Sequence, residues 1–445
     1  MFFFGDGGLP PAETKRAKST EKAGCLTCGS LLIDAYSLVD SVIVAQFAGD
    51  RSLSVLAAVN GCMAIGYCLV QGAAGACHIV LANHYGARRF DEFRDAAHTM
   101  RLVMAIFSSL VAAAYILLSG TLLRMMHVPA EIFDESRAVL WIYALNLPPI
   151  GVNSVSGAIM NGSGNSKVPM IYGTIAQVMN LVLDYFAVAV WGFGVMGAAA
   201  ASLFSISAET VWMLYRTGRE LRRVAGGKTV PRKSYAVLMA KIGLPSIAQR
   251  SVLALGAMVL QTLVNDYGTD GINSYTAANT ISNFLLVPVL ACCTGYETFA
   301  AQNLGAGKTD RVRSGWRMLL LSGLVLNLAL TAATALGAGA LTRLYLPDQD
   351  SAAFAHARSY LLLLIPNYFL QFGKSSLEAV FKAHLKISLV TVSAMLSLAV
   401  RVALGYALAP SYGITALACS TNAGSAAALA LCLILYRVRF RGMPA

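Results

Sequence analysis

The sequence predicts an all-α polytopic membrane protein with twelve transmembrane helices in two six-helix lobes, and three observations support this prediction. The 445-residue chain is 57% hydrophobic and only 13% charged, whereas globular domains carry roughly 25% charged residues. Its apolar runs recur along the whole chain, and each exceeds the roughly 20 residues that cross a bilayer. The second half also repeats the first half at a constant spacing.

Charged or Gly- and Pro-rich breaks divide the chain into twelve apolar segments, whose ends are uncertain by several residues. They are residues 24–48, 52–82, 97–120, 135–160, 168–191, 197–216, 236–266, 271–302, 314–338, 355–381, 387–409 and 414–436. The first 22 residues contain a basic run but no cleavable signal pattern, so we expect a cytoplasmic arm.

The basic residues fix the expected orientation. If the N-terminus is cytoplasmic, 26 of the 34 Lys and Arg residues fall on the inner side, as the positive-inside rule requires. We therefore expect a multi-pass protein of the cell (inner) membrane with both termini in the cytoplasm. This topology accounts for the net charge of +12, and nucleic-acid binding is disfavoured because the basic residues are spread over seven short segments.

An internal repeat sets the domain organisation. A shift of 219 residues places Gly49 on Gly268, Gly86 on Gly305 and Gly194 on Gly413 without a gap. Such a parallel duplication predicts two lobes related by a pseudo-two-fold axis along the membrane normal, with a central cleft and alternating access. The expected parts are a cytoplasmic arm (1–22), an N-terminal lobe (23–216), a basic linker (217–234), a C-terminal lobe (235–437) and a cytoplasmic tail (438–445).

Intramembrane carboxylates break the symmetry of the repeat. Asp40, Asn180 and Asp184 correspond to apolar residues in the second half, and a carboxylate at membrane depth costs at least about 2.5 kcal/mol, so each is a functional candidate. At about 1.5 Å per residue, Asp40, Asp184 and Ser202 reach the same depth. Gln177, Asn180 and Asp184 share one helix face. Neighbouring carboxylates repel, so one of them should hold a proton near neutral pH and could take it up and release it. The same oxygen atoms could instead coordinate Na⁺. The remaining alternative is that these residues only form hydrogen bonds in helix packing.

Several other polar residues are weaker candidates. Those that could line the cleft or contact substrate are Asp34, Tyr36, Ser37, Asn60, Asn153, Gln177, Gln261 and Arg401. Lys374 and Glu378 are spaced as a plain i, i+4 ion pair with a snorkelling lysine. His78 and Glu297 occupy equivalent repeat positions and are expected at the membrane interface. Glu209 and Arg250 lie at one depth in different lobes, so an inner gate pair is one hypothesis for them.

The chain resembles the multidrug and toxic compound extrusion (MATE) transporters from about Lys22 to Arg437. The similar motifs are residues 38–41 (LVDS), 82–87 (ANHYGA) and their repeat 301–306 (AQNLGA), 162–167 (GSGNSK), 180–185 (NLVLDY) and 243–246 (GLPS). Asn83 and His84 depart from the family's loop pattern in the first copy. Pro245 corresponds to Leu26, so the first-span proline of some members is absent, which puts a proline bend in span 1 in doubt.

The resemblance implies a secondary antiporter that exports amphipathic, cationic organic compounds in exchange for H⁺ or Na⁺, with Asp40, Asn180, Asp184 and Ser202 as the coupling site. The chain resembles the DinF-like branch more than the NorM-like branch, because span 7 carries Gln261 and Asn265 where a membrane glutamate would be expected in the NorM-like branch. The alternatives are a flippase or exporter of lipid-linked oligosaccharide or other anionic solutes, and a sensory or scaffold protein. We expect no enzymatic activity, cofactor or structural metal, and a monomer whose partners are the bilayer and a small-molecule substrate.

Overall fold

The computed structural model describes residues 49–75, 77–126, 128–226, 230–343, 345–346 and 351–439. Within these ranges every regular element is a helix, so the fold is all-α as predicted. The expected cytoplasmic arm and the first span (24–48) lie outside the described residues. The eleven later spans each lie on one helix or on two consecutive helices.

Seven α-helices and one π-helix form the first half. They are α2 (Gly49–Ala74), α3 (Cys77–Gly86), α4 (Phe90–Met125), α5 (Ala130–Leu145), α6 (Leu147–Gly162), α7 (Lys167–Asp184), η1 (Tyr185–Val190) and α8 (Gly194–Val224). The chain leaves α8 at Val224 and enters α9 at Lys233, so much of the expected linker 217–234 is helical. The boundaries assigned to the two lobes remain predictions.

The second half contains seven further α-helices and a short 3₁₀ turn. They are α9 (Lys233–Asn265), α10 (Gly268–Gly305), α11 (Thr309–Arg343), α12 (Ala352–Leu363), α13 (Ile365–Ala383), α14 (Ile387–Tyr412), η2 (Gly413–Thr415) and α15 (Ala416–Arg439). Nine stretches of the described chain are long and apolar enough to cross a membrane; one of them, 387–438, contains both α14 and α15. The pair α12–α13 is not among the nine, because Lys374, Glu378 and Lys382 lower its hydropathy.

The backbone repeats at the spacing that the sequence predicts. The fourth span breaks at Asn146, ahead of Pro148 and Pro149, and the tenth breaks at Leu364, ahead of Pro366. Proline lacks an N–H donor and is tolerated only in the first turn of a helix, so a new helix begins there. Positive φ angles recur in the same way, with Arg88 at 58° and Gly307 at 68°, and with Gly194 at 55° and Gly413 at 63°.

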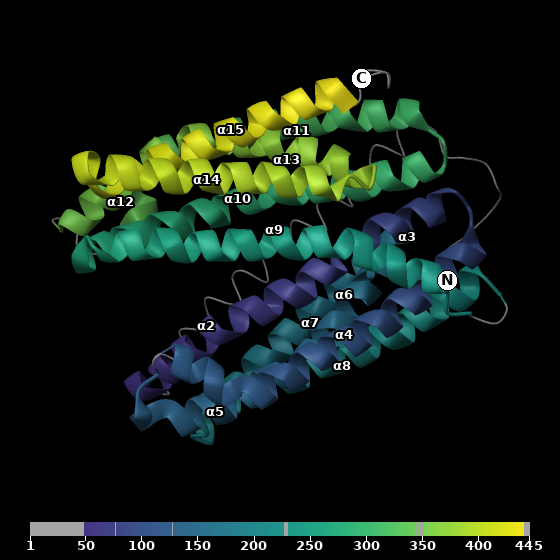
Figure 1. Ribbon diagram of the computed structural model, residues 1–445, viewed down its shortest axis with the longest axis horizontal. Coiled ribbons are helices and arrows are strands. Elements are labelled where there is room, and N and C mark those ends of the chain that lie inside the picture. Colours follow the sequence, from purple (N-terminus) through teal and green to yellow (C-terminus); the bar gives the residue numbers. More distant parts are fainter. Residues whose placement is uncertain are drawn as a thin grey trace.

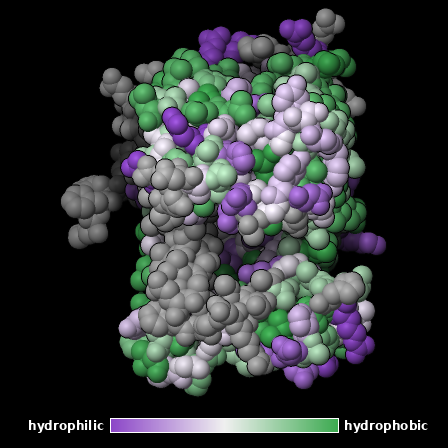
Figure 2. All heavy atoms as spheres, turned by 90° about the vertical axis from the view of Figure 1, so that its left-hand side faces the viewer, coloured by the Kyte–Doolittle hydropathy of each residue, from purple (hydrophilic) through white to green (hydrophobic). Residues whose placement is uncertain are grey.

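The two halves pack together at one end, which we call the linker end because α8 ends and α9 begins there. Helix α2 contacts α9, and α3 contacts α10. Near the linker end a Cβ on Gly72 would lie only 2.7 Å from Cα of Ile247. Figure 1 shows the halves diverging toward α5 and α12. Seen from that side, the surface is hollowed between the two halves (Figure 2).

The crossing of α3 and α10 brings two backbones into direct contact. A Cβ on Gly86 would collide with the carbonyl oxygen of Gln302, and a Cβ on Gly305 would collide with the carbonyl oxygen of Asn83. These two contacts are related by the repeat shift. The Gln302 amide also donates from Nε2 to the carbonyl oxygen of Gly162 at 2.8 Å. The linker end is therefore closed by backbone contact between the repeats.

We expect Gly86→Ala to destabilise the protein by about 2 kcal/mol, because an added methyl group in a filled contact forces the backbones apart. Gly120→Ala is the matched control, since a Cβ at Gly120 meets nothing within 4 Å and alanine favours helix. Thermal unfolding in detergent would show a lower melting temperature for Gly86→Ala alone. Equal melting temperatures would contradict the close crossing.

Candidate functional site

A polar cluster joins α7 to α8 in the first half. Asn180 donates from Nδ2 to Oδ2 of Asp184 at 2.9 Å. Ser202 of α8 donates from Oγ to Oδ1 of Asn180 at 3.5 Å. Asp184 is fully buried and Asn180 is 6% exposed. The structure thus brings together three of the four residues predicted for cation coupling, while the fourth, Asp40, lies outside the described residues.

The helix changes its winding directly after Asp184. Residues Tyr185–Val190 form a π-helix, in which Trp191 N–H bonds to the carbonyl of Phe186, five residues earlier. The equivalent residues 404–409 are α-helical within α14. π-Helical turns are rare and are often found at functional sites. The unusual backbone and the buried carboxylate therefore occur together, and among the described residues they do so in the first half alone.

The remaining predicted residues are distributed over several helices. Asp34, Tyr36 and Ser37 lie outside the described residues. Gln177 is half-buried one turn before Asn180, and Asn60 of α2 is exposed. Gln261 is half-buried on α9. None of these is joined to the Asn180–Asp184–Ser202 cluster by a described hydrogen bond.

Glu209 of α8 has a partner that the sequence analysis did not assign to it. The Asn153 side chain of α6 lies near the Glu209 carboxylate, which is 8% exposed. Arg250 is exposed on α9, and its carbonyl oxygen accepts a contact from Cys68 Sγ at 3.8 Å. No ion pair joins the described Glu209 and Arg250, so the inner gate pair is not present in this structure. Glu209 instead lies where α8 packs against α6.

The second half holds a cation in its interior. Arg401 of α14 donates from Nη2 to the Tyr275 hydroxyl at 3.4 Å, and the Tyr275 ring meets Tyr360 edge-on at 5.8 Å. Tyr360 in turn lies near Thr421, which is the repeat equivalent of Ser202. The buried Nε of Arg401 has no acceptor among the described residues. A buried guanidinium N–H without an acceptor is costly, so this position favours an anionic or acceptor group.

An ionic group joins the two halves at the linker end. Nε2 of His78 lies 2.6 Å from Oε1 of Glu297, and Nζ of Lys382 lies 3.3 Å from Oε2 of Glu297. Glu297 is 3% exposed, so neighbouring helices enclose its carboxylate, and its expected position at the membrane interface stays a prediction. Equivalent residues of a two-fold repeat can meet at the symmetry axis. Because His78 and Glu297 are equivalent and a histidine can pair with a carboxylate, the sequence contained a signal for this contact.

A second buried ion pair lies within the second half. Lys374 and Glu378 are 3.8 Å apart, as their spacing predicts, and Ser393 of α14 donates to Glu378 at 2.6 Å. Both charged residues are 8% exposed, so the lysine does not snorkel to the interface. This pair ties α13 to α14.

Comparison with known proteins identifies the family. The MatE family model matches residues 26–186 and 245–407. The chain belongs to the MatE family. Its MATE relatives include the probable multidrug resistance proteins YpnP (23% identical, 64% of each chain) and YoeA (21% identical, 79% of this chain and 77% of the relative) of Bacillus subtilis. The match thus spans just under two thirds of YpnP. A protein of Shewanella oneidensis named FAD transporter is 21% identical over 76% of this chain and 75% of its own.

Solved structures of MATE transporters share the fold. A variant of the Vibrio cholerae MATE transporter VcmN gives a TM-score of 0.89 at 17% identity and covers 96% of this chain and 98% of its own. An outward-facing multidrug resistance MATE transporter gives 0.87 at 19% identity, with 95% of each chain covered. The two-lobe, twelve-helix architecture predicted from the sequence therefore fits the family fold. The DinF-like branch stays a prediction.

We expect Glu297→Gln to weaken the closed linker end by about 3 kcal/mol, because His78 and Lys382 lose their buried counter-charge. Double electron–electron resonance between labels at the exposed His98 of α4 and Thr309 of α11, in a variant without the native cysteines, should show longer distances. Glu378→Gln, which also breaks a buried pair with lysine but within one half, is the control and should lower stability only. Unchanged distances in Glu297→Gln would refute a closing role for the triad.

Proposed function

We propose that this MATE protein is a secondary antiporter that exports amphipathic, cationic organic compounds in exchange for H⁺ or Na⁺. The observation that carries the proposal is the fully buried Asp184 with its partners Asn180 and Ser202. A carboxylate at membrane depth is costly and is a functional site by default. Its repeat position in the second half is Ala403, so the shared scaffold does not require it.

The proposed mechanism is alternating access between two lobes. The positive-inside rule favours a cytoplasmic linker end, and with this orientation the structure corresponds to an outward-open state. From outside, H⁺ or Na⁺ reaches Asp184 and neutralises it, and a cationic substrate loses its counter-charge and leaves. After the lobes rock, loss of the ion to the cytoplasm restores the carboxylate for the next substrate. Asp40, the fourth residue expected at the coupling site, would bind the ion together with Asp184.

The donor set supports either coupling ion. A buried carboxylate with an amide and a hydroxyl can hold a proton, and the same oxygens are ligands suited to Na⁺. We propose no cofactor, no catalytic reaction and no oligomeric requirement. The DinF-like assignment belongs to this proposal and rests on Gln261 and Asn265 in span 7.

We expect Asp184→Asn to abolish gradient-driven transport, because asparagine neither binds a proton nor carries the charge that attracts a cation. The measurement is uptake of a fluorescent organic cation into everted vesicles, driven in turn by a pH gradient and by a Na⁺ gradient. Asp266→Asn, which removes an exposed carboxylate at the end of α9, should retain wild-type uptake. Full uptake by Asp184→Asn would overturn the proposed site, and the effective gradient identifies the ion.

A second candidate function is export of anionic solutes. The observation that favours it is the interior Arg401 with its Nε lacking a described acceptor, together with the relative named FAD transporter. Arg401 would then bind the anionic group of the substrate with Tyr275.

We expect Arg401→Gln to abolish uptake of a fluorescent organic anion and to spare the cation if this second function holds, because glutamine cannot pair with an anion. Arg401→Lys, which keeps the charge, should restore part of the uptake. If neither gradient drives anion uptake by the wild type, the second candidate is excluded.

A further inference from the structure

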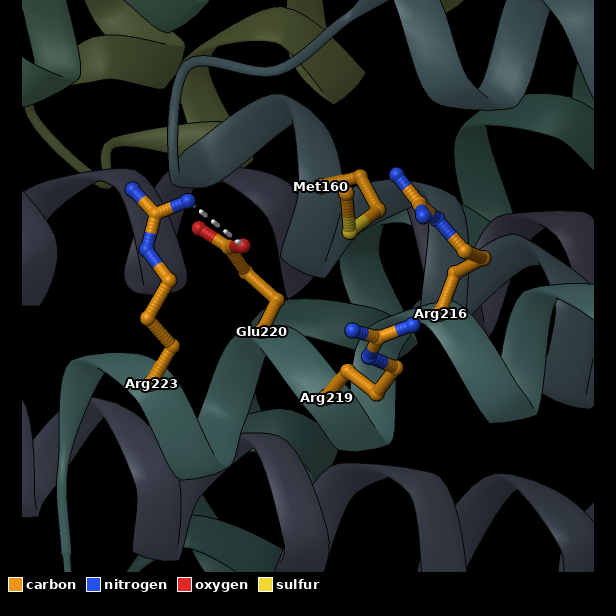
Figure 3. A pocket seen from close by; sticks show the side chains of 5 residues that line it. All are labelled: Met160, Arg216, Arg219, Glu220 and Arg223. Carbon is orange, nitrogen blue, oxygen red and sulfur yellow. Dashed lines mark ion pairs between the residues drawn. The ribbon is translucent and has the colours of Figure 1, made fainter. Parts of the chain in front are cut away.

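The linker end of α8 carries a basic pocket away from the cleft. Its lining residues are Met160, Arg216, Arg219, Glu220 and Arg223, and its volume is about 320 Å³. Figure 3 shows Arg216 and Arg219 extending alongside Met160, with Glu220 turned toward Arg223. Met160 is 1% exposed, so the pocket has a buried apolar wall beneath its charged rim. We define these five residues as the α8 pocket.

The charges of the α8 pocket are not balanced. Arg223 lies 3.8 Å from the Glu220 carboxylate, so this pair is neutral. Arg216 and Arg219 make no ion pair with any described carboxylate; Arg219 instead stacks over the Tyr215 ring at 5.8 Å. The pocket lining therefore has three guanidinium groups and one carboxylate, and Arg216 and Arg219 are the two cations that make no described ion pair. Guanidinium groups bind phosphate oxygens in a bidentate manner.

An apolar stripe leads along α8 to this pocket. Phe204, Val211 and Tyr215 recur at helical spacing on its exposed face, and the next position on that face is Arg219. Trp212 beside them packs against Tyr172 of α7, with 6.1 Å between the ring centroids. Tryptophan and tyrosine concentrate where hydrocarbon meets headgroups. The order along the helix thus matches a lipid molecule, with apolar side chains beside the acyl chains and arginines beside the headgroup.

We propose that the α8 pocket binds the phosphate-bearing headgroup of an anionic phospholipid, with the acyl chains along the α8 stripe. Arg216 and Arg219 contact the phosphate, and Tyr215 orients Arg219 by stacking. The site is separate from Asp184 and does not depend on the proposed transport function. An inorganic phosphate would satisfy the same guanidinium groups but would leave the apolar stripe unused, and this difference distinguishes the two sources of phosphate.

The test compares lipid binding by the purified full chain in nanodiscs and by native mass spectrometry. Phosphatidylglycerol should bind to the wild type more tightly than phosphatidylcholine. The double variant Arg216→Gln with Arg219→Gln should weaken phosphatidylglycerol binding about thirtyfold, because each basic residue near an anionic lipid contributes about one order of magnitude or less. Arg222→Gln removes an exposed arginine of the same turn that does not line the pocket, so it should bind as the wild type does.

Two results would overturn the proposal. The first is equal loss of phosphatidylglycerol binding in the double variant and in Arg222→Gln, which would indicate general attraction to basic residues. The second is stabilisation of the wild type against heat by inorganic phosphate as effectively as by phosphatidylglycerol, which would assign the pocket to a small anion. A far-ultraviolet circular dichroism spectrum equal to that of the wild type ensures that the double variant is folded.

Discussion

The arrangement of the lobes depends on the crossing of α3 and α10 at the pseudo-two-fold axis. Gly86 and Gly305 allow the two backbones to touch, and a side chain at either position would collide with the partner's carbonyl group. Beside this crossing, Glu297 gathers His78 and Lys382. Because the halves are fixed to each other here and along the nearby parts of α2 and α9, their separation increases toward the opposite end. The open cleft is a consequence of closure at the linker end.

The duplicated frame carries chemistry that is not duplicated. Helix breaks and positive φ angles repeat at the same spacing. Asn180 and Asp184, in contrast, correspond to alanines at the equivalent positions of the second half. The second half instead holds the half-buried Arg401 beside Tyr275, whose ring meets Tyr360. Charges inside a membrane are costly and are functional candidates. The two halves therefore differ in the charge that they carry at these positions, although their backbones follow one repeat.

Hydropathy and the constant repeat shift were enough to predict eleven of the spans and the all-α fold, because span length and periodicity are local properties. Helical spacing and depth also predicted that Asn180, Asp184 and Ser202 meet. Burial by distant helices was not predictable in this way. The contact of Lys382 with Glu297 was not predicted, and Glu209 was considered with Arg250, because a single span does not show which neighbours cover it. The π-helix after Asp184 has no sequence signal at all.

Helix α7 connects the buried carboxylate to the contact between the lobes. Asp184 ends this helix, and its other end follows the turn 163–166, directly after the Gly162 carbonyl that Gln302 holds. A helix of 18 residues is a rigid rod about 27 Å long. Asp184 and the Gln302 bond therefore lie at opposite ends of one rigid element. The π-helix lies at the Asp184 end, where the winding departs from that of the rest of the helix.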